Sequence, residues 1–317
     1  MKKFIIFFIL GILLFALIIG RCNQGDTYIG EETADHVVAR DLEKAPAIRV
    51  QSDDKPEDDE PQVSINLDSD GLEIPVFTKE RPSQLLRRKA YMTSYNRETR
   101  CPNWVAWRLT EEHTDGPYNR KGVPYYDDDG IAIGIGRVTE ETQKGDYFAD
   151  MECEEPRQSL FDWSTEYNMS HGHLCPAGDN RWDKEAMNQS FLLTNMCPQD
   201  YDLNGGGWKK LEEKCRKWAE RFGEVYIVAG PIFRGARHKK LGEILIPEAF
   251  FKVVLCMKGE PKAVGFIYEN DSQSQSMYDN VCSVDEVEAV TGMDFFSALP
   301  DSIENEIEAK ANLNDWK

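Results

Sequence analysis

Histidine is scarce in this sequence, and closely spaced cysteine pairs are absent from it. Only five of the 317 residues are histidine, and none of the eight cysteines belongs to a CxxC pair. The cysteine spacing therefore excludes a zinc ribbon and a thioredoxin-type redox motif. The chain also lacks internal repeats and long glycine and serine tracts, so a single folded domain is the simplest organisation.

Positive charge is in deficit as well, and the excess of acidic residues is densest in one segment. The formal net charge of the chain is -19, and residues 22–70 alone contain 14 acidic and 4 basic side chains, a net of -10. A segment this charged, with few aromatic residues, does not bury enough apolar surface to order itself. We therefore predict a disordered acidic linker over residues 22–70, a globular domain over 71–300 and a charged C-terminal tail over 301–317.

Basic residues of the globular part gather in three groups. One group alone is most often a solvated face, whereas three groups near one site would form a surface that binds phosphate. The groups are Arg87, Arg88, Lys89, Arg97 and Arg100; Lys209, Lys210, Lys214, Arg216, Lys217 and Arg221; and Arg234, Arg237, Lys239 and Lys240. A polyanion-binding surface is therefore compatible with the acidic total.

The N-terminus has the layout of an export signal. Two lysines precede an apolar run from Phe4 to Gly20, and an arginine follows it, which is typical of a signal peptide or an uncleaved membrane anchor over residues 1–21. The run is at the short limit for a spanning helix, so its length does not decide between cleavage and anchoring. The lysines predict a cytoplasmic N-terminus and an exported remainder, which is periplasmic, membrane-anchored or secreted. Export would also permit disulfides.

Hydrophobic periodicity predicts a sheet with flanking helices. The strongest helical signal is an apolar stripe from Trp208 to Phe222, which Gly223 is placed to end. Strands are predicted over residues 104–109, 225–230, 249–257 and 263–268, and a short helix over 284–290. A turn at residues 258–261 joins the last two strands as an antiparallel hairpin. These elements indicate an α+β fold with a central antiparallel sheet flanked by helices.

Two of the five histidines, His171 and His173, are separated by one glycine. In an extended segment their side chains share a face and would reach one ligand, so a zinc-binding protein is one interpretation. Zinc needs further ligands nearby, for which Cys175 is the obvious candidate. A histidine pair alone is more often structural, and the sequence that follows decides between the interpretations.

That sequence contains an ordered series of motifs. They are HLCPAGDN at 173–180, FLLTNMCPQ at 191–199, LNGGGW at 203–208 and LE at 211–212. The series resembles the DNA/RNA non-specific endonucleases, the ββα-metal family that includes mitochondrial endonuclease G and secreted bacterial nucleases. The resemblance is dense over residues 162–233 and looser over 71–300. It implies a ββα-metal catalytic motif and an enzyme that cuts DNA and RNA without sequence preference.

Carried over position by position, the resemblance implies five roles. His173 is the general base, and Asn204 is the direct protein ligand of a single divalent cation, Mg²⁺ or Mn²⁺. Glu212 orients the waters of that cation, and Asn195 supports the same site. Arg216 contacts the phosphate, and its spacing from Glu212 places both side chains on one helical face.

The positions before His173 depart from the family pattern. The family usually carries Asp-Arg-Gly-His, whereas this sequence has Ser170 and His171 at the first two positions. His171 then stands at a substrate-binding position where the family has an arginine. It restores the positive charge of that arginine only when it is protonated. The resemblance therefore implies weaker activity, or activity shifted toward lower pH. Arg157 is a further substrate-binding candidate carried over from the upstream segment 155–157.

These residue types also suit phosphodiester hydrolysis by their own chemistry. The reaction needs a deprotonated water, a counter-charge for the phosphorane and a proton for the leaving 3′-oxygen, and it leaves 5′-phosphorylated products. An imidazole with a pKa of about 6.5 suits the first task near neutral pH. A cation held by one amide and otherwise by water suits Mg²⁺, which gives up its hydration shell reluctantly.

Two other functions remain open from sequence. The change at Ser170 and His171 would leave a pseudo-nuclease that binds nucleic acid without cutting it if it had cost the site its activity. The zinc protein using His171 and His173 is the second alternative. Structural interpretations also exist for single residues, because Asn204 before three glycines suits a turn or helix cap and Glu212 suits a solvated helix position.

Overall fold

The computed structural model describes residues 71–119, 147–164 and 169–317, which belong to one compact unit from Ile65 to Lys317. The predicted N-terminal signal or anchor and the acidic linker lie outside the described residues. In the described ranges, no helix has the length and apolar character needed to cross a membrane.

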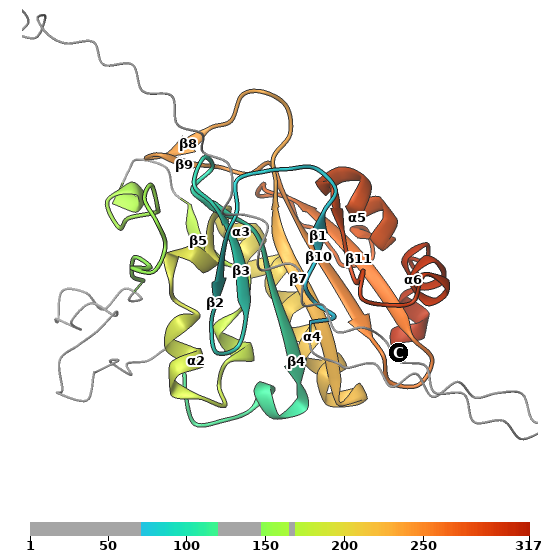
Figure 1. Cartoon of the computed structure of the whole chain (residues 1–317). Coiled ribbons are helices and arrows are strands. Elements are labelled where there is room, and N and C mark those ends of the chain that lie inside the picture. Colours follow the sequence, from blue (N-terminus) through green and yellow to red (C-terminus); the bar gives the residue numbers. More distant parts are fainter. Residues whose placement is uncertain (1–70, 120–146, 165–168) are drawn as a thin grey trace, which may run out of the picture. The chain divides into compact units, whose positions relative to one another are not determined.

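A seven-stranded antiparallel sheet forms the centre of the domain, in the order β12-β11-β10-β7-β4-β3-β2 (Figure 1). The strands are β2 (Gln84–Arg87), β3 (Met92–Asn96), β4 (Cys101–Thr110), β7 (Glu224–Ile232), β10 (Ala249–Cys256), β11 (Lys262–Glu269) and β12 (Val281–Cys282). The four predicted strands correspond to β4, β7, β10 and β11, and β10 and β11 form the predicted antiparallel hairpin.

The sheet has a hydrophobic core on each face. Successive side chains of a strand point to opposite faces, so Phe250 and Val254 of β10 enter the core that includes α4 (Lys209–Phe222). Phe251 and Val253 enter the other core, which includes residues of α5 (Val284–Thr291) and α6 (Asp301–Glu308). Helices on both faces of an antiparallel sheet confirm the predicted α+β class.

Helix α4 follows the predicted apolar stripe. Its buried residues are Leu211, Cys215, Trp218 and Ala219. Gly223 ends the helix with φ 87°, a conformation that residues with a Cβ rarely adopt. The predicted short helix is also present as α5, which begins with a capping box between Ser283 and Glu286.

The C-terminal segment differs from the charged tail expected over residues 301–317. It forms α6 and a 3₁₀ turn at Leu313–Trp316. Trp316 is buried, with its ring centroid 4.5 Å from that of Trp218, and its carbonyl accepts a hydrogen bond of 3.0 Å from the Trp218 indole. Apolar residues spaced among the charges, Ile307 included, therefore attach this segment to the core.

The remaining elements are short. Two-stranded antiparallel sheets are formed by β1 (Val76–Phe77) with β13 (Met293–Asp294), by β5 (Ser170–His173) with β6 (Met196–Gln199), and by β8 (Lys240–Leu241) with β9 (Ile244–Leu245). Short helices are α2 (Lys184–Gln189), α3 (Tyr201–Leu203), 3₁₀ turns at Glu111–Thr114, Asp162–Ser164, Ala177–Asp179 and Leu193–Asn195, and a π-helical turn at Asn204–Trp208. Residues 147–160 form an irregular segment with one isolated bridge, between Phe148 and Leu192.

The cysteines within the described residues are free thiols. Six are buried, and Cys282 is half-buried. Cys256 lies in the core of β10, as expected for a small buried hydrophobic residue. The disulfides that export would permit are therefore not formed among these seven residues.

Candidate active site

The two histidines project from a ribbon, β5 with β6, that is separate from the main sheet. Ser170 and Gly172 face inward, whereas His171 and His173 are half-buried on the other face. A Cβ atom on Gly172 would lie 2.5 Å from the Cβ of Gln199, so the glycine allows the two strands to approach. Ser170 strengthens the same pairing, because its hydroxyl donates to the Gln199 carbonyl at 2.7 Å.

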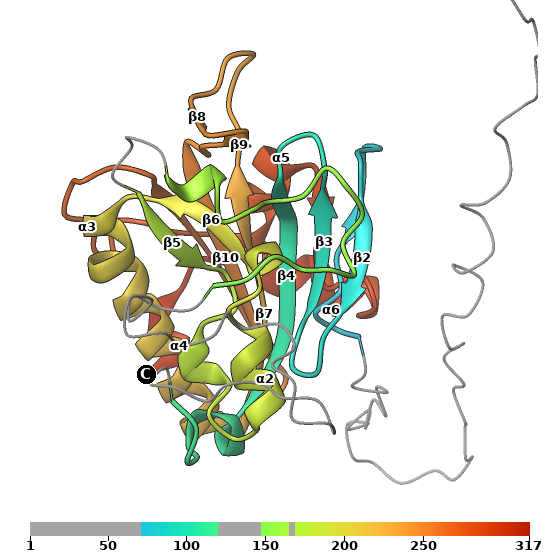
Figure 2. The same cartoon turned by 90° about the vertical axis from the view of Figure 1, so that its left-hand side faces the viewer.

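The chain continues from this ribbon through α3 into a widened helical turn and then α4. The π-helical turn begins at Asn204, and Gly206 within it has the non-helical angles φ -109° and ψ -105°. Its last residue, Trp208, donates an indole hydrogen bond to the carbonyl of His173 at 3.3 Å. Figures 1 and 2 both place β5 beside α3. Two antiparallel strands followed by a helix that contacts them give the expected ββα arrangement.

Asn204 and Glu212 have the chemistry of ligands for a hard cation. Both side chains are half-buried. The Asn204 amide makes no hydrogen bond within the described part of the chain, so its oxygen is available as a ligand. Amide and carboxylate oxygens with water are the ligand set that Mg²⁺ prefers. These two residues therefore fit the divalent cation that the sequence predicts.

Arg216 is held by a buried carboxylate. Its Nη1 donates to Oδ1 of Asp179 at 2.8 Å, and the indole of Trp107 donates to the other carboxylate oxygen at 3.1 Å. Burial raises the pKa of Asp179 despite the attraction of Arg216. One-fifth of the Arg216 side chain remains exposed. This guanidinium is therefore fixed in place beside the ribbon and keeps one accessible edge.

Asn195 has its side chain fully engaged with the backbone. Its Oδ1 accepts from the Cys175 amide at 2.9 Å, and its Nδ2 donates to the carbonyls of Cys175 and Ser190, both at 2.8 Å. The residue is completely buried. Asn195 therefore positions the segment after His173 and does not present its amide to a metal or substrate, contrary to a direct catalytic role.

His171 lies between two aromatic rings. Its ring is stacked on Tyr147 at 3.9 Å and on Trp163 at 3.8 Å between centroids. Burial lowers the pKa of His171 to about 4. The imidazole is therefore neutral near pH 7, so it does not replace the missing arginine as a phosphate-binding cation there. The predicted shift of activity toward lower pH would need a pH near 4.

His173 shares this aromatic surrounding. Its ring lies 5.7 Å from that of Tyr147 and 5.3 Å, edge to face, from that of Phe191. Aromatic walls restrict the orientation of the imidazole, whose Nε2 atom is buried although the residue as a whole is half-buried.

Arg157 is tied into its own loop. Its guanidinium donates to the Cys153 carbonyl at 2.7 Å and pairs with Glu155 at 3.1 Å. The neighbouring Gln158 joins this loop to β6, because its Nε2 donates to the Met196 carbonyl at 2.9 Å. Arg157 therefore lies in a loop that Gln158 attaches to β6. Its guanidinium contacts residues of that loop, Cys153 and Glu155.

Comparison with known proteins decides the family. The model of the DNA/RNA non-specific endonucleases matches residues 68–302. The chain belongs to this family. It is 30% identical to the mitochondrial nuclease EXOG of Homo sapiens over 225 residues, covering 65% of this chain and 55% of that protein. It is 27% identical to a nuclease of Nostoc over 265 residues, covering 80% and 88%.

A solved structure supports the fold. One chain of the crystal structure of the EndoG/EndoGI complex superposes with a TM-score of 0.58 at 20% identity, covering 71% of this chain and 89% of that one. The chain spans only 55–60% of the length of the EXOG nucleases of Danio rerio, Mus musculus and Homo sapiens. The family is one of divalent-metal-dependent nucleases, in agreement with the ligand chemistry of Asn204 and Glu212.

The prediction of an exported protein is contradicted by these relatives. The EXOG nucleases of Danio rerio, Mus musculus and Homo sapiens and the nuclease 1 of Schizosaccharomyces pombe are all named as mitochondrial. An apolar run behind two lysines indicates affinity for a membrane, and this property does not by itself specify a compartment. The predicted signal at residues 1–21 also lies outside the described residues.

The zinc interpretation receives no support from the ribbon. Across the described ranges, the only three His, Cys, Asp or Glu side chains close enough to hold one metal ion are Asp285, Glu288 and Glu308. Cys175, the suggested third zinc ligand, is almost completely buried. Burial raises the pKa of its thiol well above the usual value, which disfavours the thiolate that zinc requires.

Lys252 is a site neighbour that sequence reasoning missed. It is fully buried, and its Nζ lies 4.4 Å from the ring centroid of Trp208 and 5.4 Å from that of Trp107. These are cation–π contacts with the two indoles that hold His173 and Asp179. Lys252 is the one charged residue in the apolar strand 250–256, and that exception was the available signal.

The three groups of basic residues predicted from sequence differ in how many of their charges are paired with carboxylates. Arg88 is buried in ion pairs with Asp150 and Glu152, and Arg234 pairs with Glu269. The group on α4 differs, because Lys209, Lys210, Lys217 and Arg221 are exposed and form no ion pair within the described residues. Positive charge therefore remains available on the helix that follows Asn204.

Proposed function

We propose that this chain is a metal-dependent endonuclease that hydrolyses phosphodiester bonds of DNA and RNA without sequence preference and leaves 5′-phosphorylated products. His173 acts as general base and Asn204 as the direct protein ligand of one divalent cation, Mg²⁺ or Mn²⁺. The observation that carries this proposal is the hydrogen bond from Trp208 to the His173 carbonyl. It joins the base-bearing strand to the turn that begins at Asn204.

The residues divide the reaction between them. The half-buried His173 imidazole accepts the proton of the attacking water, as a neutral imidazole does in general base catalysis. Glu212 orients water at the cation. A divalent cation held by Asn204 would supply counter-charge for the phosphorane and would lower the pKa of a water that can protonate the leaving oxygen.

Substrate contacts in this proposal are to the phosphate backbone, which carries no sequence information. The accessible edge of Arg216 contacts the phosphate near the cut, and the exposed basic residues of α4 contact the flanking backbone. Phosphate contacts of this kind weaken with salt. We assign His171 a neutral, stacking role beside the substrate, and we assign Arg157 a role in loop structure.

A plasmid-nicking assay in Mg²⁺ tests the proposal. We expect the wild-type chain to nick supercoiled DNA and to degrade RNA, and we expect His173→Ala and Asn204→Ala each to lower the rate at least ~100-fold, the low end of what general acid–base catalysis contributes. His238→Ala is the matched control, because it removes a half-buried histidine that pairs with Glu248 and has no role in the proposed reaction. This control should keep the wild-type rate.

Two results would refute the proposal. The first is a His173→Ala variant that is folded by circular dichroism and cuts at the wild-type rate, which would show that His173 is not the general base. The second is a wild-type chain that binds DNA but leaves it uncut in both Mg²⁺ and Mn²⁺, which would identify the chain as a pseudo-nuclease. The 5′-phosphate is checked on the products, which should accept a radioactive phosphate from polynucleotide kinase only after phosphatase treatment.

A further inference from the structure

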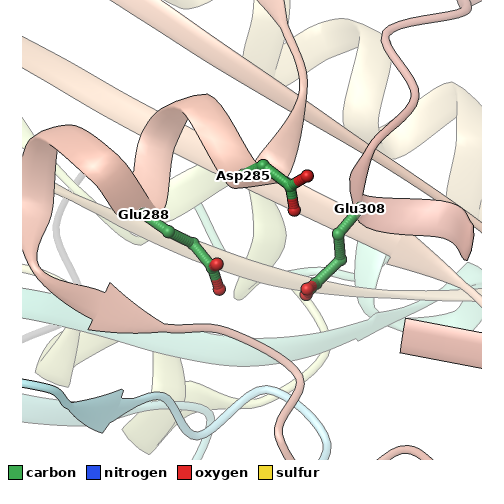
Figure 3. Close-up of side chains that lie close together, drawn as sticks. All are labelled: Asp285, Glu288 and Glu308. Carbon is green, nitrogen blue, oxygen red and sulfur yellow. The ribbon is translucent and has the colours of Figure 1, made fainter. Parts of the chain in front are cut away.

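Three carboxylates converge on the face of the sheet that α5 and α6 cover. Asp285 and Glu288 belong to α5, and Glu308 is the last residue of α6. One oxygen from each lies within 4.8 Å of the other two. Figure 3 shows the three side chains pointing toward a common space between the helices.

Glu308 is buried in this group without a partner. Its exposed fraction is 4%, and its Oε1 makes no hydrogen bond within the described residues. A carboxylate removed from water in this way costs several kcal/mol unless it is protonated or meets a positive charge. None of the three carboxylates forms an ion pair with a basic side chain of the described chain.

The neighbouring charges are also negative. Burial, together with the repulsion of the nearby carboxylates Glu288, Glu304, Asp285 and Asp294, raises the pKa of Glu308 to about 9. Burial likewise raises the pKa of Glu288 to about 7. The group therefore lacks a counter-charge from the chain, and a proton or a cation must supply it.

We infer that Asp285, Glu288 and Glu308 form a second cation site, selective for Ca²⁺ and separate from the proposed catalytic metal. An oxygen-only ligand set excludes a preference for zinc. Calcium accepts 6–8 oxygens at about 2.3–2.6 Å in flexible geometry, which suits carboxylates that come from two separate helices and share the ion with water. Magnesium requires a smaller, near-octahedral shell and keeps its waters.

Each ligand has a distinct place in this site. Oε1 of Glu288 accepts a hydrogen bond of 2.8 Å from the Phe295 amide, which fixes the side chain and leaves its second oxygen for the ion. Asp285 is exposed and gives the ion access to solvent and water ligands. Glu308 closes the site from α6. A bound ion thus joins the two helices and fastens α6 to the domain.

The test uses the full chain, stripped of metal with EDTA and dialysed, in a thermal melt with increasing CaCl₂. We expect Ca²⁺ to raise the Tm in a concentration-dependent way, because an ion that binds only the folded state stabilises it. Glu308→Gln should abolish this shift, since the amide keeps nearly the same shape and lacks the carboxylate that binds the ion. Isothermal titration should show at least a tenfold loss of Ca²⁺ affinity in this variant.

Two controls isolate the site. Glu306→Gln changes an exposed carboxylate on the same helix, where it pairs with Lys310, and should retain the Ca²⁺ shift. His173→Ala and Asn204→Ala should also retain it, so a failure of the proposed catalytic metal does not affect this result. If Glu308→Gln fails to fold, Asp285→Asn on the exposed rim gives the same measurement.

Three outcomes would overturn the inference. The first is an unchanged wild-type Tm up to about 10 mM CaCl₂, roughly tenfold above the weak limit of protein calcium sites. The second is a Ca²⁺ shift that survives in both Glu308→Gln and Asp285→Asn. The third is a metal-free Tm that rises on mild acidification while Ca²⁺ has no effect, which would show that protons alone satisfy the cluster.

Discussion

The stacked His171 gives a pH-dependent stability that can be removed with one substitution. In His171→Phe, a phenyl ring replaces the imidazole between Tyr147 and Trp163 and keeps the aromatic stack. The Nε2 atom of His171 is buried and makes no hydrogen bond to any described residue, so phenylalanine leaves no partner unsatisfied. The main difference between the two proteins is then the ability to take up a proton.

The size of the effect follows from the pKa of His171 in the two states. Burial lowers that pKa to about 4 in the folded chain, against about 6.5 in the unfolded chain. The folded state favours the neutral ring, so its stabilising contribution is complete above about pH 6.5 and is lost as the pH falls toward 4. At about 1.4 kcal/mol per pH unit, the full loss is about 3 kcal/mol, and the loss at pH 4.5 is about 2.5 kcal/mol.

Urea unfolding of both proteins at pH 7 and pH 4.5 measures this contribution. The wild-type chain should lose about 2.5 kcal/mol more than His171→Phe between these pH values, because the other ionisable groups are the same in both proteins and cancel in the comparison. A difference between the two proteins that stays constant with pH would refute the neutral, buried assignment of His171. It would also restore His171 as a candidate cation at the substrate.

Three further predictions concern the same site. His171→Arg should raise the nicking rate at neutral pH, since a guanidinium stacks between aromatic rings and remains charged; an unchanged or lower rate would show that this position does not limit activity. Asp179→Ala should lower the free energy of unfolding by about 3 kcal/mol, because it leaves Arg216 without its buried partner. Urea unfolding measures this change, and a decrease of less than about 1 kcal/mol would contradict the pairing. Asn195→Ala should cost about 2–3 kcal/mol through the unsatisfied backbone of Cys175 and Ser190, measured as a lower urea midpoint, and an unshifted midpoint argues against this positioning role.

Local patterns were sufficient to predict the main elements of the fold. Helix α4 and strands β4, β7, β10 and β11 have regular apolar periodicity, so their positions follow from residues close together in sequence. The C-terminal segment was not predicted correctly, because Trp316 is held by Trp218, almost a hundred residues earlier. Most of its residues are charged or polar, so the few apolar residues that attach it to the core, Ile307 and Trp316, do not form a recognisable pattern.

The site shows the same division. The motif order located His173 and Asn204, since each belongs to a short segment with a distinctive spacing. The aromatic slot around His171 is formed by Tyr147 and Trp163 from separate segments, and no local pattern connects them. The pKa of His171 depends on that slot. Its charge state was therefore inaccessible from sequence, although its position was not.

The separation of the β5 and β6 ribbon from the seven-stranded sheet has a consequence for durability. The ribbon is attached to the rest of the domain by hydrogen bonds from Trp208, Gln158 and Asn270 to backbone carbonyls, and by the buried strand β6, whose Cys197 packs in the core that includes α4. Opening the ribbon would therefore expose part of that core, and a segment opens at low free energy only when it has few buried contacts. Heat inactivation should therefore coincide with unfolding of the main sheet. Substitutions that strengthen the sheet would then extend the working life of the site as well as raise the melting temperature.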